Sequence, residues 1–298
     1  LFFYTHTPAY EMLRSLVGSE MCIRDRNITA SEVNKLRQTT GAGMMDCKNA
    51  LVESKGDFDK ALDFLRKKGQ KVAANRADRD SSEGVVLAKV NSENTSGIII
   101  SLNCETDFVA KNEDYIKLAN QIADLALNHK SLDSLLNADF NGISLKEKLT
   151  EQTGIIGEKI ELKEFKRIDN NYVGFYVHAG NKIASLVSLS EKIEKSEELS
   201  KNIAMQIAAM NPISLDENNV DRKIIEKEIE IAKEQLRIEG KPESMLDNIA
   251  KGKLKRFFKD NTLLNQAYIK DNKISVNSYV KTISESIKVE SFARVSLV

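Results

Sequence analysis

Three segments near the start of the chain carry apolar residues every three or four positions, the spacing of helices that bury one face. The first segment opens with Thr29-Ala30-Ser31-Glu32, which has the spacing of a capping box. Glycines end all three segments, and the third bears the clearest apolar stripe, made of Phe58, Ala61, Leu62 and Leu65. The pattern predicts a three-helix bundle over residues 27–70, and the polar stretch 71–83 that follows indicates a linker.

The pattern then changes to runs of β-branched residues, which are typical of strands. Residues 84–90 and 97–102 flank a polar loop and predict a hairpin, and an amphipathic helix is predicted after Asn112. The same order of strand, turn, strand and helix recurs over residues 172–208. We interpret this recurrence as a weak internal duplication, with the first copy in a core subdomain over residues 84–168.

A second core subdomain is predicted over residues 169–215 and 261–298, on either side of the most charged part of the chain. Within that charged part, Gly240-Lys241-Pro242 separates two helical patterns, so residues 216–260 predict a protruding helical hairpin. The expected fold class is therefore α+β, with an N-terminal three-helix bundle, a duplicated strand-strand-helix core and a helical arm.

Residues 1–26 do not share these patterns. The chain starts at Leu1 rather than Met, and the stretch 16–26 resembles a translated adapter sequence. A mitochondrial transit peptide is the competing interpretation, but Glu11, Glu20 and Asp25 make the segment too acidic for one. We expect a non-native extension here that is disordered or poorly packed.

Composition narrows the functional classes. Lys plus Arg and Asp plus Glu both number 44, so no net basic field attracts nucleic acid. The three cysteines form neither a paired framework nor a C-x-x-C motif, which suggests a reducing compartment. The three histidines lack metal-ligand spacing, and no apolar run approaches the roughly 20 residues that span a bilayer. No phosphate-binding loop, nucleophile elbow or zinc-protease motif is present.

The stretch Thr106-Asp107-Phe108-Val109 stands at the corner between the second predicted strand and the following helix. In one interpretation Asp107 caps a turn and Phe108 is the first core residue of the helix. In the other, both residues serve a binding site. The second copy of the strand-strand-helix pattern has no counterpart to this pair, which favours a function for the corner. Glu105 and Asp107 alone make a weak case for a metal site.

Several blocks, in order from Ile28 to about Arg294, resemble the elongation factor Ts family, the nucleotide-exchange factors of elongation factor Tu. The likeness rests on residues 39–48, 103–112, 240–243, 252–258 and 263–269. The chain departs from the family at Gln206, where a histidine is common, and at Ala267, where a proline is usual. It also lacks the family's usual ending after Arg294, so a truncated C-terminal tail is expected.

The resemblance implies a protein that is not an enzyme but binds elongation factor Tu, both GDP-bound and nucleotide-free, and promotes GDP release by disturbing its Mg²⁺ and phosphate site. Its N-terminal bundle would resemble a ubiquitin-associated fold. Thr106, Asp107, Phe108 and Val109 would form the exchange wedge. Because neighbouring residues on a helix lie about 100° apart, at least one of Met44 and Met45 is expected to be exposed. The partner-docking residues carried over from the family are Leu36, Met44, Met45 and His178.

The resemblance implies no cofactor, no metal, no membrane contact and no direct nucleic-acid binding, and it allows self-association through the helical arm. The expected location is the bacterial cytoplasm, or the mitochondrial matrix or plastid for an organellar protein. Two alternatives come from other classes. A ribosome- or RNA-associated binding protein would use the basic stretch 71–79 and the arm. A thiol enzyme would use Cys104, although no base is visible near it in the sequence.

Overall fold

The computed structural model describes residues 28–297, and the predicted extension 1–26 lies outside this range. The chain divides into two compact units. Of the described residues, the helical unit comprises 28–75 together with Glu151–Gly157, and the core unit comprises Arg76–Thr150 and residues 158–297.

The helical unit contains α1 (Ala30–Thr40), α2 (Met44–Glu53), α3 (Phe58–Asn75) and the last part of α7 (Leu145–Ile156). The predicted capping box is confirmed, because the Glu32 amide donates to Thr29 Oγ1 at 3.2 Å and the Thr29 amide donates to Glu32 Oε2 at 2.9 Å. The α3 helix continues to Asn75, into the polar stretch 71–83. The core of this unit includes the buried residues Val33, Leu36, Cys47, Ala50, Leu51 and Ala61.

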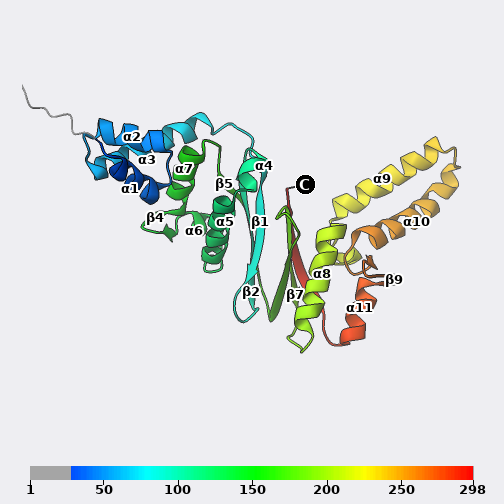
Figure 1. Cartoon of the computed structure of the whole chain (residues 1–298). Coiled ribbons are helices and arrows are strands. Elements are labelled where there is room, and N and C mark those ends of the chain that lie inside the picture. The colour runs from blue at the N-terminus through cyan, green and yellow to red at the C-terminus, as the bar shows by residue number, and fades with distance from the viewer. Residues whose placement is uncertain (1–27, 298) are drawn as a thin grey trace, which may run out of the picture. The chain divides into compact units, whose positions relative to one another are not determined.

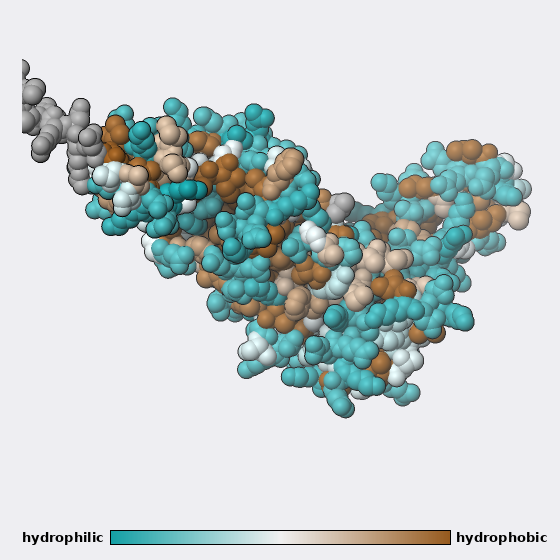
Figure 2. Space-filling view, viewed as in Figure 1, coloured by the Kyte–Doolittle hydropathy of each residue, from teal (hydrophilic) through white to brown (hydrophobic). Residues whose placement is uncertain are grey.

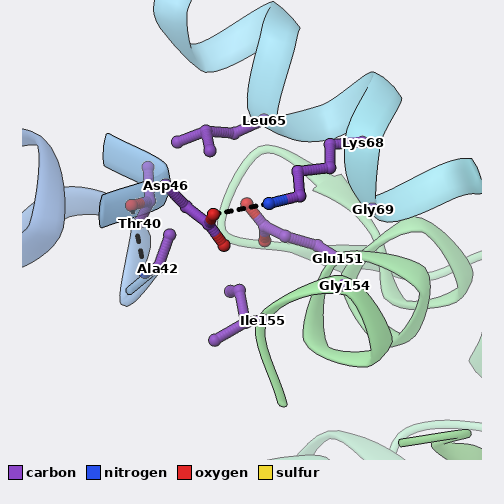
Figure 3. A pocket seen from close by; sticks show the side chains of 9 residues that line it. All are labelled: Thr40, Ala42, Asp46, Leu65, Lys68, Gly69, Glu151, Gly154 and Ile155. Atoms are coloured by element: carbon purple, nitrogen blue, oxygen red, sulfur yellow. Dashed lines mark hydrogen bonds and ion pairs between the residues drawn. The ribbon is translucent and has the colours of Figure 1, made fainter. Parts of the chain in front are cut away.

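Two glycines let α3 and the last part of α7 approach closely within the helical unit. A Cβ atom added at Gly154 would lie 2.3 Å from the Cα atom of Gly69, so the backbones leave no room for a side chain. Figure 3 shows the small pocket beside this crossing. Lys68 on α3 donates to Asp46 on α2 at 2.5 Å, and Glu151 on α7 lies next to this pair (Figure 3).

The core unit is built on two three-stranded antiparallel sheets (Figure 1). The first has the order β1 (Glu83–Val90), β2 (Ser96–Cys104), β5 (Glu161–Asp169), and the second has the order β10 (Val289–Ser296), β7 (Ile183–Leu189), β6 (Tyr172–Val177). The sheets pack against each other, and the buried residues between them include Val86, Ala88, Ile99, Val173, Ala184 and Leu186. Each predicted hairpin is therefore completed by a third strand that comes from later in the chain.

Helices cover the outer faces of both sheets. The α5 helix (Glu113–Ala126) lies on β1 and β2, and α8 (Ser196–Met210) lies on β6 and β7. The core unit thus has the layers helix, sheet, sheet, helix (Figure 1). This architecture, with the helical bundle before it, confirms the predicted α+β class.

The charged part of the chain forms a helical arm of α9 (Arg222–Ile238) and α10 (Glu243–Asn261), which extends away from the sheets of the core unit (Figure 1). Ala232, Leu236, Leu246 and Ala250 are its buried apolar residues. Ion pairs join the two helices, with Lys233 Nζ 2.6 Å from Asp247 Oδ1 and Arg237 Nε 2.7 Å from Glu243 Oε1. Apolar surface gathers at the end of the arm in Figure 2, where Ile238 and Met245 are exposed.

Buried amide side chains hold the base of the arm. Gln206 on α8 is fully buried, and its Nε2 atom donates to Gln266 Oε1 at 3.1 Å while its Oε1 atom accepts from the Ile269 amide at 2.8 Å. Gln266 in turn donates to the carbonyl of Asp260 at 3.0 Å, near the end of α10. Gln206 therefore has a structural role at the base of the arm.

Short elements complete the core unit, namely α4 (Asp107–Ala110), α6 (Leu132–Leu136), β3 (Asp139–Phe140), β4 (Ile143–Ser144), the 3₁₀ helix η1 (Glu217–Asn219), β8 (Ala267–Tyr268), β9 (Asp271–Ser275) and α11 (Val276–Ile283). Among the described residues, no helix is both long and apolar enough to cross a membrane.

Candidate functional site

The predicted corner is a single helical turn, α4, that follows directly after the buried strand β2. Phe108 in this turn is 82% exposed, whereas Phe64 and Phe175 are 39% exposed. Burying a phenylalanine side chain stabilises a fold by about 1.5–3 kcal/mol, and Phe108 makes almost none of this contribution. The interpretation of Phe108 as the first core residue of a helix is therefore wrong, and its side chain is available to a partner.

Asp107 does not cap the turn. The N-cap residue of α4 is Thr106, and it makes no side-chain capping bond to the helix. Asp107 Oδ2 instead accepts a hydrogen bond from Lys111 Nζ at 2.6 Å, and this bond holds the pKa of Asp107 below its usual value. The corner therefore presents an ionised carboxylate beside an exposed aromatic ring.

The remaining residues of the corner attach it to the protein. Ala110 is buried, and Thr106 and Val109 are half-buried. The Thr106 hydroxyl points away from α4 and donates to Glu158 Oε1 at 2.7 Å. The four residues Thr106 to Val109 thus combine the exposed Phe108 ring and the half-buried Asp107 carboxylate with two residues that anchor the turn.

Cys104 lies beneath the corner, where it is fully buried and its Sγ atom donates to the Thr106 carbonyl at 3.1 Å. Burial raises the pKa of this thiol to about 11, with a smaller opposing effect from the hydroxyl of Tyr115. A thiol with such a pKa is protonated at neutral pH, and the nucleophile in thiol chemistry is the thiolate. Its environment therefore argues against the thiol-enzyme alternative.

The predicted docking residues of the helical unit differ in exposure. Met44 and Met45, at the start of α2, are 60% and 64% exposed, so both side chains are accessible. Leu36 is fully buried in the core of the unit, on the inward face of α1. Leu36 therefore cannot line a docking surface, because its side chain is used to pack the three helices. It supports the unit from inside instead.

His178 is exposed just after the end of β6, in the second sheet of the core unit. Its Nδ1 atom lies 3.1 Å from the Tyr176 hydroxyl, and the two rings are tilted with centroids 6.0 Å apart. The alternative of a partly buried strand-end histidine therefore does not hold. The exposed His178 ring, held beside the partly buried Tyr176, can offer both apolar contact and hydrogen bonding to another protein.

Sequence reasoning missed two residues that contact the corner. Lys111 lies in the same block as Asp107, and its distance of four residues within a helical stretch is a signal that could have found the ion pair. Glu158 lies 52 residues after Thr106, and no local pattern connects the two. Within residues 28–297 there is no group of three or more His, Cys, Asp or Glu side chains that could hold a metal ion.

Comparison with known proteins identifies the family. The family model for elongation factor Ts matches residues 105–297. Elongation factor Ts of Christiangramia forsetii is 64% identical over 270 residues, which cover 91% of this chain and 98% of that protein. Elongation factor Ts of Flavobacterium psychrophilum is 60% identical over 270 residues, with the same coverage of 91% and 98%. Elongation factor Ts of Amoebophilus asiaticus is 49% identical over 271 residues, which cover 90% and 98%.

The α+β core, the helical unit and these relatives together define a translation elongation factor. Within that class, the chain belongs to the elongation factor Ts family.

Proposed function

We propose that the protein is the guanine-nucleotide exchange factor of elongation factor Tu and that it acts by binding, without covalent chemistry. The single observation that carries this proposal is the exposure of Phe108 beside an ionised Asp107, in a chain that belongs to the elongation factor Ts family. The partner is elongation factor Tu in its GDP-bound and nucleotide-free forms.

The mechanism follows from linkage between two ligands of one protein. Suppose that this protein binds nucleotide-free elongation factor Tu more tightly than the GDP-bound form. It then weakens the affinity of elongation factor Tu for GDP by the same ratio. Phe108 enters an apolar cleft of the partner, where burying its ring provides favourable free energy that the free factor lacks. Asp107 brings a negative charge against the polar contacts that hold Mg²⁺, while Thr106 and Val109 fix the shape of the corner.

Docking is assigned to exposed residues on both units. Met44 and Met45 provide adaptable apolar contacts, because an unbranched thioether side chain fits irregular surfaces. His178, with Tyr176 beside it, provides contacts from the core unit. These residues supply binding energy, whereas the corner supplies the energy that distinguishes the nucleotide-free partner from the GDP-bound one.

The proposal includes no cofactor, no metal of the factor's own and no membrane contact, and it places the protein in the bacterial cytoplasm. It also includes self-association through the helical arm, which is supported by the exposure of Ile238 at the end of α9. No observation favours the RNA-associated alternative. In the basic stretch 71–79, Arg76 pairs with Glu105 at 2.7 Å and is not free to bind phosphate.

Stopped-flow release of mant-GDP from elongation factor Tu tests the proposal. At saturating factor, we expect Phe108→Ala to slow the stimulated release by about tenfold or more, because roughly 1.5–3 kcal/mol of burial energy is lost. Asp107→Ala is expected to slow it as well, since the charge that disturbs the Mg²⁺ contacts is removed.

Two exposed residues outside the corner serve as controls. Val52→Ala shortens an apolar side chain that is 53% exposed, and Asp114→Ala removes an aspartate that pairs with Lys117 at 3.1 Å. Both are expected to leave the rate unchanged. If the two corner variants release GDP as fast as the wild type, the proposed role of the corner is wrong.

A further inference from the structure

Two carboxylates join the corner, together with Glu105 before it, to the turn between α7 and β5. One carboxylate belongs to the corner side and bonds to the turn, and the other belongs to the turn and bonds to the corner. Glu105, at the corner, accepts from the backbone amide of Lys159 through Oε1 at 2.7 Å. Glu158, in the turn, accepts from the Thr106 amide through Oε2 at 3.0 Å and from the Thr106 hydroxyl through Oε1 at 2.7 Å. We call these four residues, Glu105, Thr106, Glu158 and Lys159, the carboxylate brace.

Arg76 supports the brace from a third segment of the chain. Its Nη1 atom donates to Glu105 Oε1 at 2.7 Å and to Oε2 at 2.9 Å. The Glu105 side chain is only 17% exposed. Burial opposes its ionisation, but the Lys159 amide and the Arg76 guanidinium outweigh this effect and hold the pKa of Glu105 below its usual value. The brace therefore contains an ionised and fully partnered carboxylate at neutral pH.

The brace lies wholly within the core unit, at two places where the chain enters that unit. Arg76 is the first residue of the core unit after Asn75, and Glu158 is the first after Gly157. Arg76 bonds to Glu105, the residue just before the corner, and Glu158 bonds to Thr106, the first residue of the corner. The corner is thus fixed to two separate segments of backbone in addition to the strand that precedes it.

The corner needs such support because it cannot hold its own conformation. The α4 helix has four residues, and an isolated helical turn is unstable in water. Thr106 would ordinarily cap the turn, but its hydroxyl is bonded to Glu158 instead. Phe108 contributes little packing because it is exposed. The direction in which Phe108 points is therefore set by what holds the two ends of the turn, namely the bonds of Thr106 at its start and the buried Ala110 at its end.

We propose that Glu158 is a positioning residue of the exchange corner, with Glu105 as its counterpart, and that the brace fixes α4 before the partner is met. The inference rests on the proposed exchange function. A pre-ordered corner spends none of its contact energy on becoming ordered in the complex, so that energy is available to displace the nucleotide. Loss of the brace should therefore lower the limiting exchange rate more than it weakens docking, which depends on residues elsewhere.

Four variants separate positioning from stability. Glu158→Gln keeps the size of the side chain but removes the charge and replaces one of the two accepting oxygens with an NH2 group, so one of the two hydrogen bonds from Thr106 is lost. Thr106→Val removes the hydroxyl donor, and Thr106→Ser restores it. The matched control is Glu164→Gln on β5, a partly exposed glutamate that pairs with Lys166 at 3.4 Å and does not contact the corner.

The experiment measures mant-GDP release over a range of factor concentrations, together with amide hydrogen exchange of the free factor over residues 105–112. For Glu158→Gln and Thr106→Val we expect a limiting rate about tenfold lower, the factor typical for losing one charge-assisted hydrogen bond, with the half-saturating concentration changed less than about twofold. In both variants the backbone amide of residue 106 should exchange its hydrogen faster than in the wild type. Thr106→Ser and Glu164→Gln should behave as the wild type.

The outcomes distinguish the two hypotheses. If Phe108→Ala slows release but Glu158→Gln and Thr106→Val do not, the positioning role is wrong and the exchange function stands. If both brace variants raise the half-saturating concentration as strongly as they lower the rate, the brace is only structural, and the positioning role is again wrong. If the wild-type factor does not accelerate release at all, the exchange function fails and the positioning role fails with it.

Discussion

At the scale of single residues, the environment decides whether a large apolar side chain packs or binds. Leu36 lies on α1 with Val33 and Thr40 on the same buried face, and the three-helix core encloses it completely. Phe108 lies on a turn of four residues, which is too short to form a buried stripe of its own. The family resemblance names both residues as partner contacts, yet of the two only Phe108 is exposed.

The thiol of Cys104 provides a test of the interior beneath the corner. Its pKa is raised from the ordinary value of 9.0 to about 11 by burial, so the unfolded chain loses this proton at lower pH than the folded protein does. The contribution of Cys104 to stability is therefore fully present below about pH 9 and is lost as the pH rises toward about 11. Urea unfolding measured between pH 8 and pH 11 should show this loss.

The control for this prediction is Cys104→Ala, because other groups also titrate in the same range. The difference in free energy of unfolding between the wild type and Cys104→Ala should be constant up to about pH 9 and should shrink above it. An equal difference at all four of pH 8, 9, 10 and 11 would show that the folded thiol has an ordinary pKa.

At the scale of secondary-structure elements, two helical glycines have opposite roles. Gly154 on α7 faces the Cα atom of Gly69 on α3, and an added Cβ would lie 2.3 Å from it. Gly252 on α10 has no atom within 4 Å of an added Cβ. We expect Gly154→Ala to destabilise the helical unit by about 1–3 kcal/mol through overpacking, because a backbone atom cannot move aside as a side chain can.

Gly252→Ala is the matched control for this substitution. It should stabilise the arm by about 0.5–1 kcal/mol, since alanine favours a helix more than glycine does. Thermal unfolding followed by circular dichroism measures both effects. If Gly154→Ala raises the melting temperature as Gly252→Ala does, the close approach of α3 and α7 is not present in solution.

The elements also show which features a sequence can predict. The capping box at Thr29 forms as its spacing predicts, because all its groups lie within four residues. The arm likewise follows from its two helical patterns and the turn between them. The carboxylate brace joins residues 52 and 54 positions apart, and periodicity carries no signal for such contacts. For the same reason, the third strand of each sheet could not be assigned to its partner from the pattern alone.

The site was predictable to a similar extent. Its corner was located from the residues at the end of a strand, and its importance from the missing counterpart in the second copy. Exposure was harder to predict, because a helical stripe shows which residues share a face but not whether a core covers that face. Leu36 was named as a docking residue from the family resemblance, yet it is buried, whereas Met44 and Met45, carried over in the same way, are both exposed.

At the scale of the whole molecule, docking and exchange are assigned to different parts of the chain. Met44 and Met45 belong to the helical unit, and Phe108 belongs to the core unit. The equal numbers of acidic and basic residues, 44 each, give no long-range attraction that could replace specific contacts. Affinity for the partner should then depend on the methionines, and the limiting exchange rate should depend on the corner.

This division predicts separable kinetic effects. The double variant Met44→Ala and Met45→Ala should weaken binding to nucleotide-free elongation factor Tu by about tenfold or more, because apolar contact area is lost, and it should leave the limiting rate of GDP release nearly unchanged. Phe108→Ala should lower the limiting rate of GDP release by about tenfold or more and should leave binding to the GDP-bound partner nearly unchanged, because the ring is proposed to favour the nucleotide-free form. Because the methionines and Phe108 are assigned different roles, combining all three substitutions should multiply the separate effects.

The measurement is mant-GDP release at a series of factor concentrations, with Val52→Ala as the control. Val52 lies on the same helix as the methionines and is 53% exposed, so it reports what losing any exposed apolar side chain of α2 does. The half-saturating concentration of the Val52→Ala variant should match that of the wild type. A limiting rate that falls in the double methionine variant as far as in Phe108→Ala would mean that the helical unit takes part in displacing the nucleotide, and the division of roles would be wrong.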